Sequence, residues 1–301
     1  MMRRETAWRV FSAELGDATL ELRGEGERAP TYLVTPLGAK INRVIAVGVI
    51  TDVENTGEDD NPYWRAKMAD PTGTFFISAG QFQPDAAKAL SRLKPPVFAA
   101  VIGKVRAYSP EPGVTYITLR PEIVKEVDAQ TRDYWVLDAC RSLRRRLHAF
   151  EETKALEKPT REAVAALGYS EVADGIITAI EHYGEADTPK YRAILLEGLR
   201  YLLPEYQQSP PAEEPAEESE AAETEEEEDA LEAMLAPTPD EEKVLKIIDD
   251  LNKDGKGVQV DKIVEAAKPK KMNKEAVEKM LESLKEKGQV YEPKLGRFMR
   301  S

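Results

Sequence analysis

Basic and aromatic residues alternate with apolar residues in several short segments of the chain. The segment YWRAKM (63–68) has Tyr63, Arg65 and Lys67 at every second position. Because successive side chains of a β-strand point to opposite faces, these three residues share one face in an extended segment. Aromatic rings stack on unpaired bases and cations bind phosphates, so this combination is what a single-stranded nucleic acid requires.

Three further segments follow the same pattern, with apolar residues at the alternate positions. The apolar set is predicted to form the core, and the other set to form one outer face. A solvated sheet face with scattered aromatic residues is the alternative, but agreement among four segments favours binding of a single-stranded nucleic acid. The predicted binding residues are Tyr63, Arg65, Lys67, Phe76, Lys104, Arg106, Tyr108, Tyr116 and Arg120.

The elements that must position these residues are five predicted strands. Val, Ile and aromatic residues concentrate in five runs that end at Gly- or Pro-containing turns. A short helix over 84–93 separates the third run from the fourth. This order matches the five-stranded Greek-key barrel called the OB-fold. The predicted strands cover residues 41–53, 63–69, 74–79, 97–108 and 114–124.

The sequence Asp70-Pro71-Thr72-Gly73 joins the second and third predicted strands. Asp at the first position of a tight turn and Pro at the second are favoured, and Gly tolerates a positive φ. We expect this turn to fix the register of the two strands and so to align Lys67 with its neighbours. Its predicted role is structural.

Charge is distributed unevenly along the 301 residues. The formal net charge is −13, but residues 209–238 alone contain 12 acidic and no basic residues. That stretch is rich in Pro, Glu and Ala and has few large apolar side chains, which predicts a disordered linker. The predicted organisation is an N-terminal extension and OB-fold (1–127), a helical region (128–206), an acidic linker (207–238) and a winged helix (239–301).

The winged helix is predicted from three helices and a terminal hairpin. Helices are expected over 240–251 and 261–267, and Asn273 is the predicted N-cap of a third helix. The third helix of such a domain often enters a DNA groove. Here it carries as many Glu as Lys residues, so a protein partner is favoured over duplex DNA.

Catalytic chemistry has little support in the sequence. Cys140 is the only cysteine and is expected to be an inert, half-buried thiol, and His148 is expected at the surface. No nucleotide-binding glycine motif, zinc-protease motif or nucleophile elbow occurs, so we expect neither an enzyme nor a cofactor nor a metal. The segment 250–261 resembles a calcium loop, but Asp261 stands where a Glu is expected, which favours a helix-ending turn.

Four arginines form a second basic cluster in the helical region. They are a candidate phosphate contact, and a solvated helix face or a docking face for the acidic linker are equally compatible alternatives. No run is long and apolar enough to cross a bilayer, so the expected location is cytoplasmic and nucleoid-associated. The cluster comprises Arg141, Arg144, Arg145 and Arg146.

Three segments of the predicted barrel resemble a known family. These are APTYLVTPLGAKINRVIAVGVI (29–50), WRAKMADPTGTFFISAGQFQP (64–84) and VIGKVRAY with YITLRPEIV (101–124). They resemble archaeal OB-fold proteins related to the second subunit of replication protein A, also called replication-protein-A-associated proteins. The end of the chain, KGQVYEPKLGRFMR, is similar to the winged helix of that subunit in eukaryotes and of archaeal replicative helicases. The resemblance covers most of 7–206 and, separately, 239–301.

The resemblance implies single-stranded DNA binding in replication, repair and recombination, within a complex that includes a larger OB-fold subunit. It also implies that the winged helix recruits replication or repair proteins, and that the binding face contains the residues predicted above. The large archaeal subunit often carries a zinc finger, which this chain lacks the ligands to form. Two other functions stay open: an assembly scaffold that does not contact DNA, and a winged-helix transcription regulator.

Overall fold

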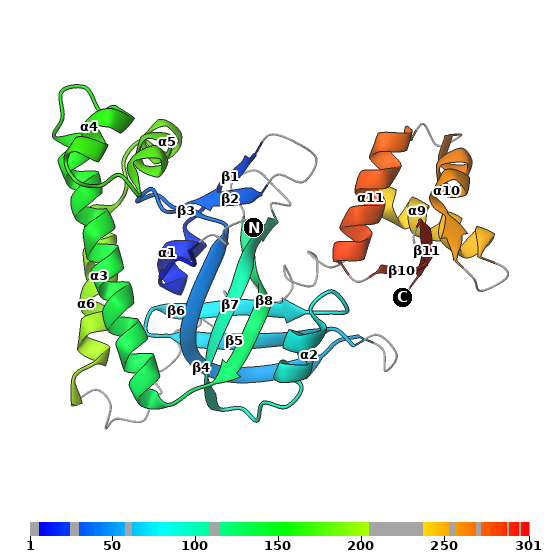
Figure 1. The fold of residues 1–301 in the computed structure, drawn as a ribbon, viewed down its shortest axis with the longest axis horizontal. Coiled ribbons are helices and arrows are strands. Elements are labelled where there is room, and N and C mark those ends of the chain that lie inside the picture. The colour runs from blue at the N-terminus through cyan, green and yellow to red at the C-terminus, as the bar shows by residue number, and fades with distance from the viewer. Residues whose placement is uncertain are drawn as a thin grey trace, which may run out of the picture. The chain divides into compact units, whose positions relative to one another are not determined.

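The chain forms two compact units in the computed structural model (Figure 1). One unit contains residues 1–56 and 64–213, and the other contains residues 57–63 and 214–301. The structure describes residues 6–24, 30–57, 62–108, 115–204, 237–252, 257–268, 272–287, 289–294 and 296–300. Most of the predicted acidic linker (207–236) and the predicted turn at 109–113 therefore lie outside the described residues.

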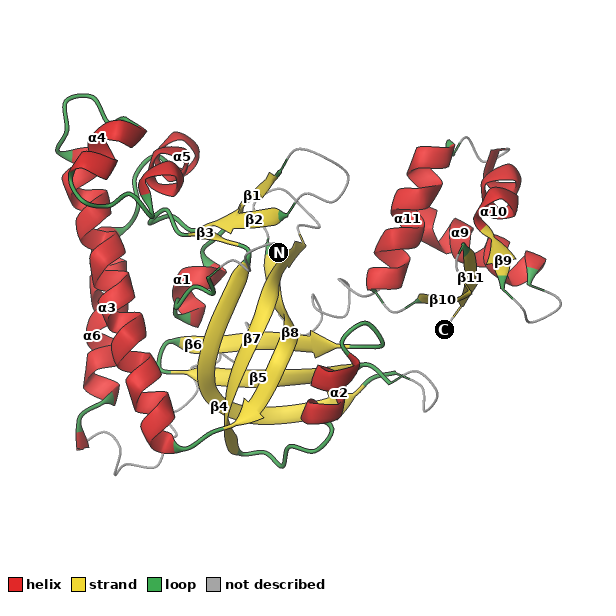
Figure 2. Ribbon diagram, viewed as in Figure 1, coloured by secondary structure: helices red, strands yellow, loops and turns green. Residues whose placement is uncertain are grey.

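Five strands of the first unit close into a barrel in the order β4-β5-β6-β8-β7 (Figure 2). The helix α2 (Pro84–Leu90) lies between β6 and β7 in the sequence. This is the OB-fold topology, and the prediction of that fold is confirmed. The strands are β4 (Arg43–Asn55), β5 (Trp64–Asp70), β6 (Gly73–Ala79), β7 (Val97–Tyr108) and β8 (Tyr116–Glu126).

The core of the barrel consists of the apolar residues that alternate with the predicted binding residues. Every second position of β5, β6 and β7 points inward, as strand geometry requires. The predicted inward residues Ile77, Val101 and Leu119 are at most 1% exposed. Since burial of a large aliphatic side chain stabilises a fold by about 1.5–3 kcal/mol, a register slip of one residue would be strongly unfavourable.

The residues before the barrel form elements that the sequence pattern did not predict. They are a short helix α1 (Ser12–Gly16) and an antiparallel sheet of β1 (Leu20–Arg23), β2 (Thr31–Val34) and β3 (Lys40–Ile41). Each is too short to show a clear hydrophobic period, which explains why periodicity missed them.

The turn between β5 and β6 holds α1 against the barrel. Ser12 donates two hydrogen bonds to the Asp70 carboxylate, from its backbone N–H and its hydroxyl, both at 2.8 Å. Thr72 donates two more, at 2.7 and 2.9 Å. Burial raises the pKa of Asp70, and the four donors act in the opposite direction by stabilising the ionised form. The turn thus has the structural role predicted for it, and it also caps α1.

Four helices follow the barrel: α3 (Ala129–Lys154), α4 (Arg161–Ala166), α5 (Ala173–Tyr183) and α6 (Thr188–Tyr201). Side chains of Asp128 and Thr160 accept hydrogen bonds from backbone N–H groups in the first turns of α3 and α4. Figure 1 shows α3 and α6 side by side at one edge of the barrel. The indole of Trp135 on α3 donates to the carbonyl of Ile45 on β4 at 2.8 Å, which fastens α3 to the barrel.

A buried ion pair joins α1 to α3. The guanidinium of Arg146 donates two hydrogen bonds to the carboxylate of Glu14, one of them from Nε at 2.8 Å. The two side chains are 2% and 0% exposed, and the hydroxyl of Thr35 also donates to Glu14 at 3.2 Å. Each charge therefore depends on the other, because neither is solvated by water.

The predicted arginine cluster is divided by this packing. Arg146 faces the interior, so its predicted role in phosphate contact is wrong. Arg145 binds Glu171 and Arg141 binds Asp138 at the surface. Among the four arginines, only the exposed Arg144 has no ion pair within the described residues. Each residue of α3 is rotated by about 100° about the helix axis from the residue before it, so adjacent arginines face different surroundings.

The described residues of the second unit form three helices and a three-stranded sheet in the order β10-β11-β9, as a winged helix requires. Thr238 and Glu241 form a capping box at the start of the first helix, and Asn273 accepts a hydrogen bond from Ala276 N–H at 2.8 Å, as predicted. The elements are α9 (Pro239–Leu251), β9 (Val258–Gln259), α10 (Val260–Ala267), α11 (Lys274–Glu286), β10 (Val290–Lys294) and β11 (Arg297–Arg300).

Replacing Arg146 by Met would leave the Glu14 carboxylate buried without its cation. We expect the barrel unit to lose about 3–5 kcal/mol in its free energy of unfolding. Urea unfolding followed by tryptophan fluorescence measures this unit alone, because Trp8, Trp64 and Trp135 all belong to it. Arg145→Met, which removes an exposed ion pair with Glu171 and a hydrogen bond to the Gly168 carbonyl, is the matched control and should cost about 1 kcal/mol or less. Equal midpoints for the two variants would contradict the assignment.

Candidate nucleic-acid interface

One row of side chains crosses four strands on the outer surface of the barrel. Lys67 on β5 is directly opposite Phe76 on β6, and Phe76 is opposite Thr118 on β8. Thr118 is in turn opposite Arg106 on β7. Because directly opposite residues of paired strands share a face, these four residues form a continuous line, here called the central row.

A second line lies beside the central row and is entirely basic. Arg120 on β8 is opposite Lys104 on β7, and Lys104 is opposite Arg43 on β4. These three residues are called the basic row. Like charges that are directly opposite one another destabilise a sheet, and the pairing of the Arg43 guanidinium with the Glu122 carboxylate offsets part of this cost.

The close approach of β7 and β8 at the basic row requires a glycine. An added Cβ at Gly103 would lie 2.4 Å from the carbonyl oxygen of Arg120. Gly103 therefore allows the two strands to meet next to Lys104 and Arg120. A larger residue at this position would separate the two strands and the cations that they present.

Exposure differs among the residues of this face. Lys104 is exposed, whereas the side chain of Arg65 is only 17% exposed and lies 3.9 Å from the Glu54 carboxylate. Thr118, which alternation assigned to the outer face, is 3% exposed. Its small side chain lies between the longer side chains of Phe76 and Arg106 in the central row, which explains its burial.

The two predicted tyrosines of β7 and β8 also meet. Tyr108 is directly opposite Tyr116, where both strands adjoin the undescribed residues 109–114. By alternation they share the face of Arg106. Tyr63 precedes β5, which begins at Trp64, and lies close to the undescribed residues 58–61. The structure therefore brings eight of the nine predicted residues onto the paired strands and leaves Tyr63 outside the register.

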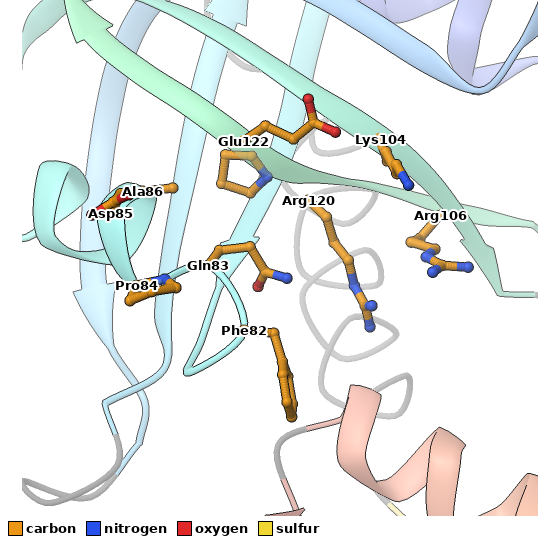
Figure 3. Close-up of a pocket in the computed structure, with 10 residues that line it drawn as sticks. Phe82, Gln83, Pro84, Asp85, Ala86, Lys104, Arg106, Arg120 and Glu122 are labelled. Atoms are coloured by element: carbon orange, nitrogen blue, oxygen red, sulfur yellow. The ribbon is translucent and has the colours of Figure 1, made fainter. Parts of the chain in front are cut away.

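An open pocket of about 350 Å³ adjoins the basic row (Figure 3). Lys104, Arg106 and Arg120 line one side of it, and Phe82 and Gln83 from the β6–α2 connection line another. Phe82 and Gln83 were not predicted, because a connecting segment has no strand period. Arg43 was also missed, because it is the only basic residue of the first predicted strand (41–53), which therefore shows no alternation of basic and aromatic residues. An aromatic residue in a polar connection, Gln-Phe-Gln, is the one local signal that could have indicated Phe82.

The cysteine and the histidine considered for chemistry, Cys140 and His148, both lie on α3 and do not line the pocket. Cys140 is buried on α3, rather than half-buried as predicted, and desolvation raises the pKa of its thiol to about 11. His148 is exposed, as expected. Within the described residues, no cluster of three or more His, Cys, Asp or Glu side chains is arranged to hold a metal ion, and no helix is long and apolar enough to cross a membrane.

The calcium-loop resemblance falls partly outside the described residues, since Asp254 and Gly255 belong to the gap at 253–256. Asn252 is the C-cap of α9, and its side-chain oxygen accepts a hydrogen bond from the backbone N–H of Gly257 at 3.0 Å. This contact is typical of a turn that ends a helix.

Comparison with known protein families finds a match in the C-terminal part of the chain. Residues 240–300 match the family described as the MCM protein C-terminal winged helix-turn-helix domain. This part of the chain is a winged-helix domain. The match covers about one fifth of the sequence and does not include the barrel. A search of curated protein sequences finds no match.

Three solved structures are similar to parts of this chain, each at low sequence identity. A structure of the S. pombe Stn1–Ten1 complex is 14% identical, with a TM-score of 0.37, and covers 46% of this chain and 90% of that chain. The second single-stranded DNA binding protein of Mycobacterium smegmatis is 15% identical, with a TM-score of 0.25, 29% coverage of this chain and 86% of that chain. The mitochondrial single-stranded DNA binding protein Rim1 of S. cerevisiae is 13% identical, with a TM-score of 0.24. The match covers 29% of this chain and 95% of that chain.

Proposed function

We propose that the chain binds single-stranded DNA through the outer face formed by the central row and the basic row. The observation that carries this proposal is the central row, in which the ring of Phe76 lies between the cations Lys67 and Arg106 across neighbouring strands. A base that stacks on this ring has its phosphates within reach of cations on either side. Bases inside a duplex are already stacked and cannot use such a ring.

The electrostatics of the barrel unit are compatible with a polyanion despite the acidic composition. Residues 1–208 hold 27 basic and 30 acidic residues, so this part is nearly neutral overall. On the proposed face, Arg43, Lys104 and Arg120 are adjacent across three strands. The strongly acidic stretch at 209–238 is a separate part of the sequence, and the overall net charge describes that stretch rather than this face.

We propose more specifically that the chain is a subunit of a replication-protein-A-like complex that acts in replication, repair and recombination. A larger OB-fold subunit is the proposed partner. The resemblance of the barrel segments supports this. Two exposed leucines of α6, Leu196 and Leu199, and Leu203 just after the helix, provide apolar surface of the kind that a protein partner covers. We further propose a binding role without catalysis, in keeping with the buried, weakly acidic thiol of Cys140.

We propose that the winged helix recruits proteins rather than duplex DNA, because its lysines are compensated. On α11, Lys274 lies 3.7 Å from Glu278 and Lys279 lies 3.3 Å from Glu275. Lys287 binds the nearly buried carboxylate of Glu241 at 2.5 Å. A helix whose cations are paired with its own carboxylates attracts phosphate weakly.

Replacing Phe76 by Ala removes the stacking ring and keeps the cations. We expect affinity for a labelled oligothymidylate of about 15 nucleotides to fall about 5- to 150-fold, the equivalent of about 1–3 kcal/mol per stacked base. Fluorescence anisotropy measures the dissociation constant. Tyr134→Ala is the matched control, since Tyr134 is an aromatic residue of α3 with 64% exposure. Unchanged affinity of the Phe76 variant, or equal losses in both variants, would refute the proposed face.

The double variant Lys274→Gln/Lys279→Gln tests the role of the winged helix in the full chain. Because each lysine is compensated by a glutamate of the same helix, duplex affinity should change by less than about twofold. It should also stay well below the affinity for the single strand of the same sequence. A large loss of duplex binding in this variant would instead assign the winged helix to double-stranded DNA.

A further inference from the structure

The pocket beside the basic row is bounded by two parts of the barrel that the sequence separates. One wall comes from β7 and β8 and carries Lys104, Arg106 and Arg120. The other comes from the connection between β6 and α2 and carries Phe82 and Gln83. Figure 3 shows Phe82 and Arg120 extending in the same direction, with Arg106 beside them. The pocket thus combines cations with an aromatic ring.

The charges around the pocket favour an anion on its β7–β8 side. Two carboxylates also line the pocket, but Glu122 is bound by the guanidinium of Arg43. The other, Asp85, is on the first turn of α2, across the pocket from the strands. The three cations therefore outnumber the carboxylates, and a phosphate is the anion that two neighbouring guanidinium groups suit well.

Phe82 is held in an exposed position by an ordered turn. The backbone N–H of Gln83 donates to the carbonyl of Gly80 at 2.9 Å, and Gln83 O accepts from Ala87 N–H at 2.8 Å. Pro84 begins α2 and restricts the backbone further. Phe82 nonetheless has 44% of its surface exposed. A large ring fixed in an exposed position loses little conformational entropy when a ligand stacks on it.

We infer that this pocket is a nucleotide subsite of the strand interface. One unpaired base stacks on the ring of Phe82, and the phosphodiester next to it binds Arg120 and Arg106. The inference rests on the proposed function, since it extends the same face. Arg106 belongs to both the central row and the pocket wall, so one strand can cover Phe76 and Phe82 in succession. A volume of about 350 Å³ is within the range of small-ligand pockets.

The test uses the full chain and oligothymidylates with a single 2-aminopurine at successive positions, because stacking on an aromatic ring quenches the fluorescence of this base. Wild-type protein should quench the probe at one position through Phe82 and at a different position through Phe76. In Phe82→Ala the first quenching should disappear while the second remains, with affinity about 5- to 150-fold weaker. Phe82→Leu, which keeps the apolar bulk, should lose the same signal.

Ile123→Ala is the matched control, because Ile123 is 47% exposed on β8 and does not line the pocket. It should bind and quench as the wild type does. If the wild type binds the probes but Phe82→Ala and Phe82→Leu match it in affinity and quenching, the subsite is overturned and the proposed function stands. If the wild type binds none of the probes, the proposed function itself fails.

Discussion

The parallel pairing of β6 with β8 is the contact on which the rest of the candidate interface depends. It involves two residue pairs, Phe76 with Thr118 and Ile77 with Leu119, and it closes the barrel. Ile77 and Leu119 are buried, so the pairing is stabilised from inside by apolar contact. On the outside it joins the aromatic hairpin β5–β6 to the cationic hairpin β7–β8. Without closure, Phe76 and Arg106 would belong to separate surfaces.

The segments around the barrel hold this arrangement in place. Asp70 at the tip of the β5–β6 hairpin binds α1 through Ser12, and α1 is bound to α3 through Glu14 and Arg146. The hairpin that carries Lys67 and Phe76 is thus connected to the helices by two polar contacts of low exposure. Such groups are costly to bury unless every partner is present, which favours one arrangement of the hairpin over others. A rigid support of this kind reduces the entropy lost when a ligand binds.

Local periodicity was sufficient to predict the barrel strands, most of the inward and outward residues and the cap at Asn273, because these depend on neighbours in sequence. It could not predict the partner of Arg146, which lies 132 residues away at Glu14. The same limit explains the error on the arginine cluster, whereas α1 was missed because it is too short to show a hydrophobic period.

The candidate site was predictable to the extent that it lies on strands. Alternation predicts the outward positions of Lys67, Phe76, Arg106 and Arg120. The position of Phe82 in the same pocket as Arg120 depends instead on the path of the β6–α2 connection, which alternation does not describe. Thr118 shows a second limit: alternation gives the face of a side chain, and the size of its neighbours decides its exposure.

Photo-cross-linking tests the central claim most directly. An oligothymidylate with 5-iododeoxyuridine at single positions, irradiated in complex with the full chain and analysed by mass spectrometry, identifies the aromatic residues that touch bases. The account predicts cross-links in the peptides that contain Phe76 and Phe82. Cross-links confined to Tyr134 on α3 or Tyr291 in the winged helix would show that the strand binds elsewhere.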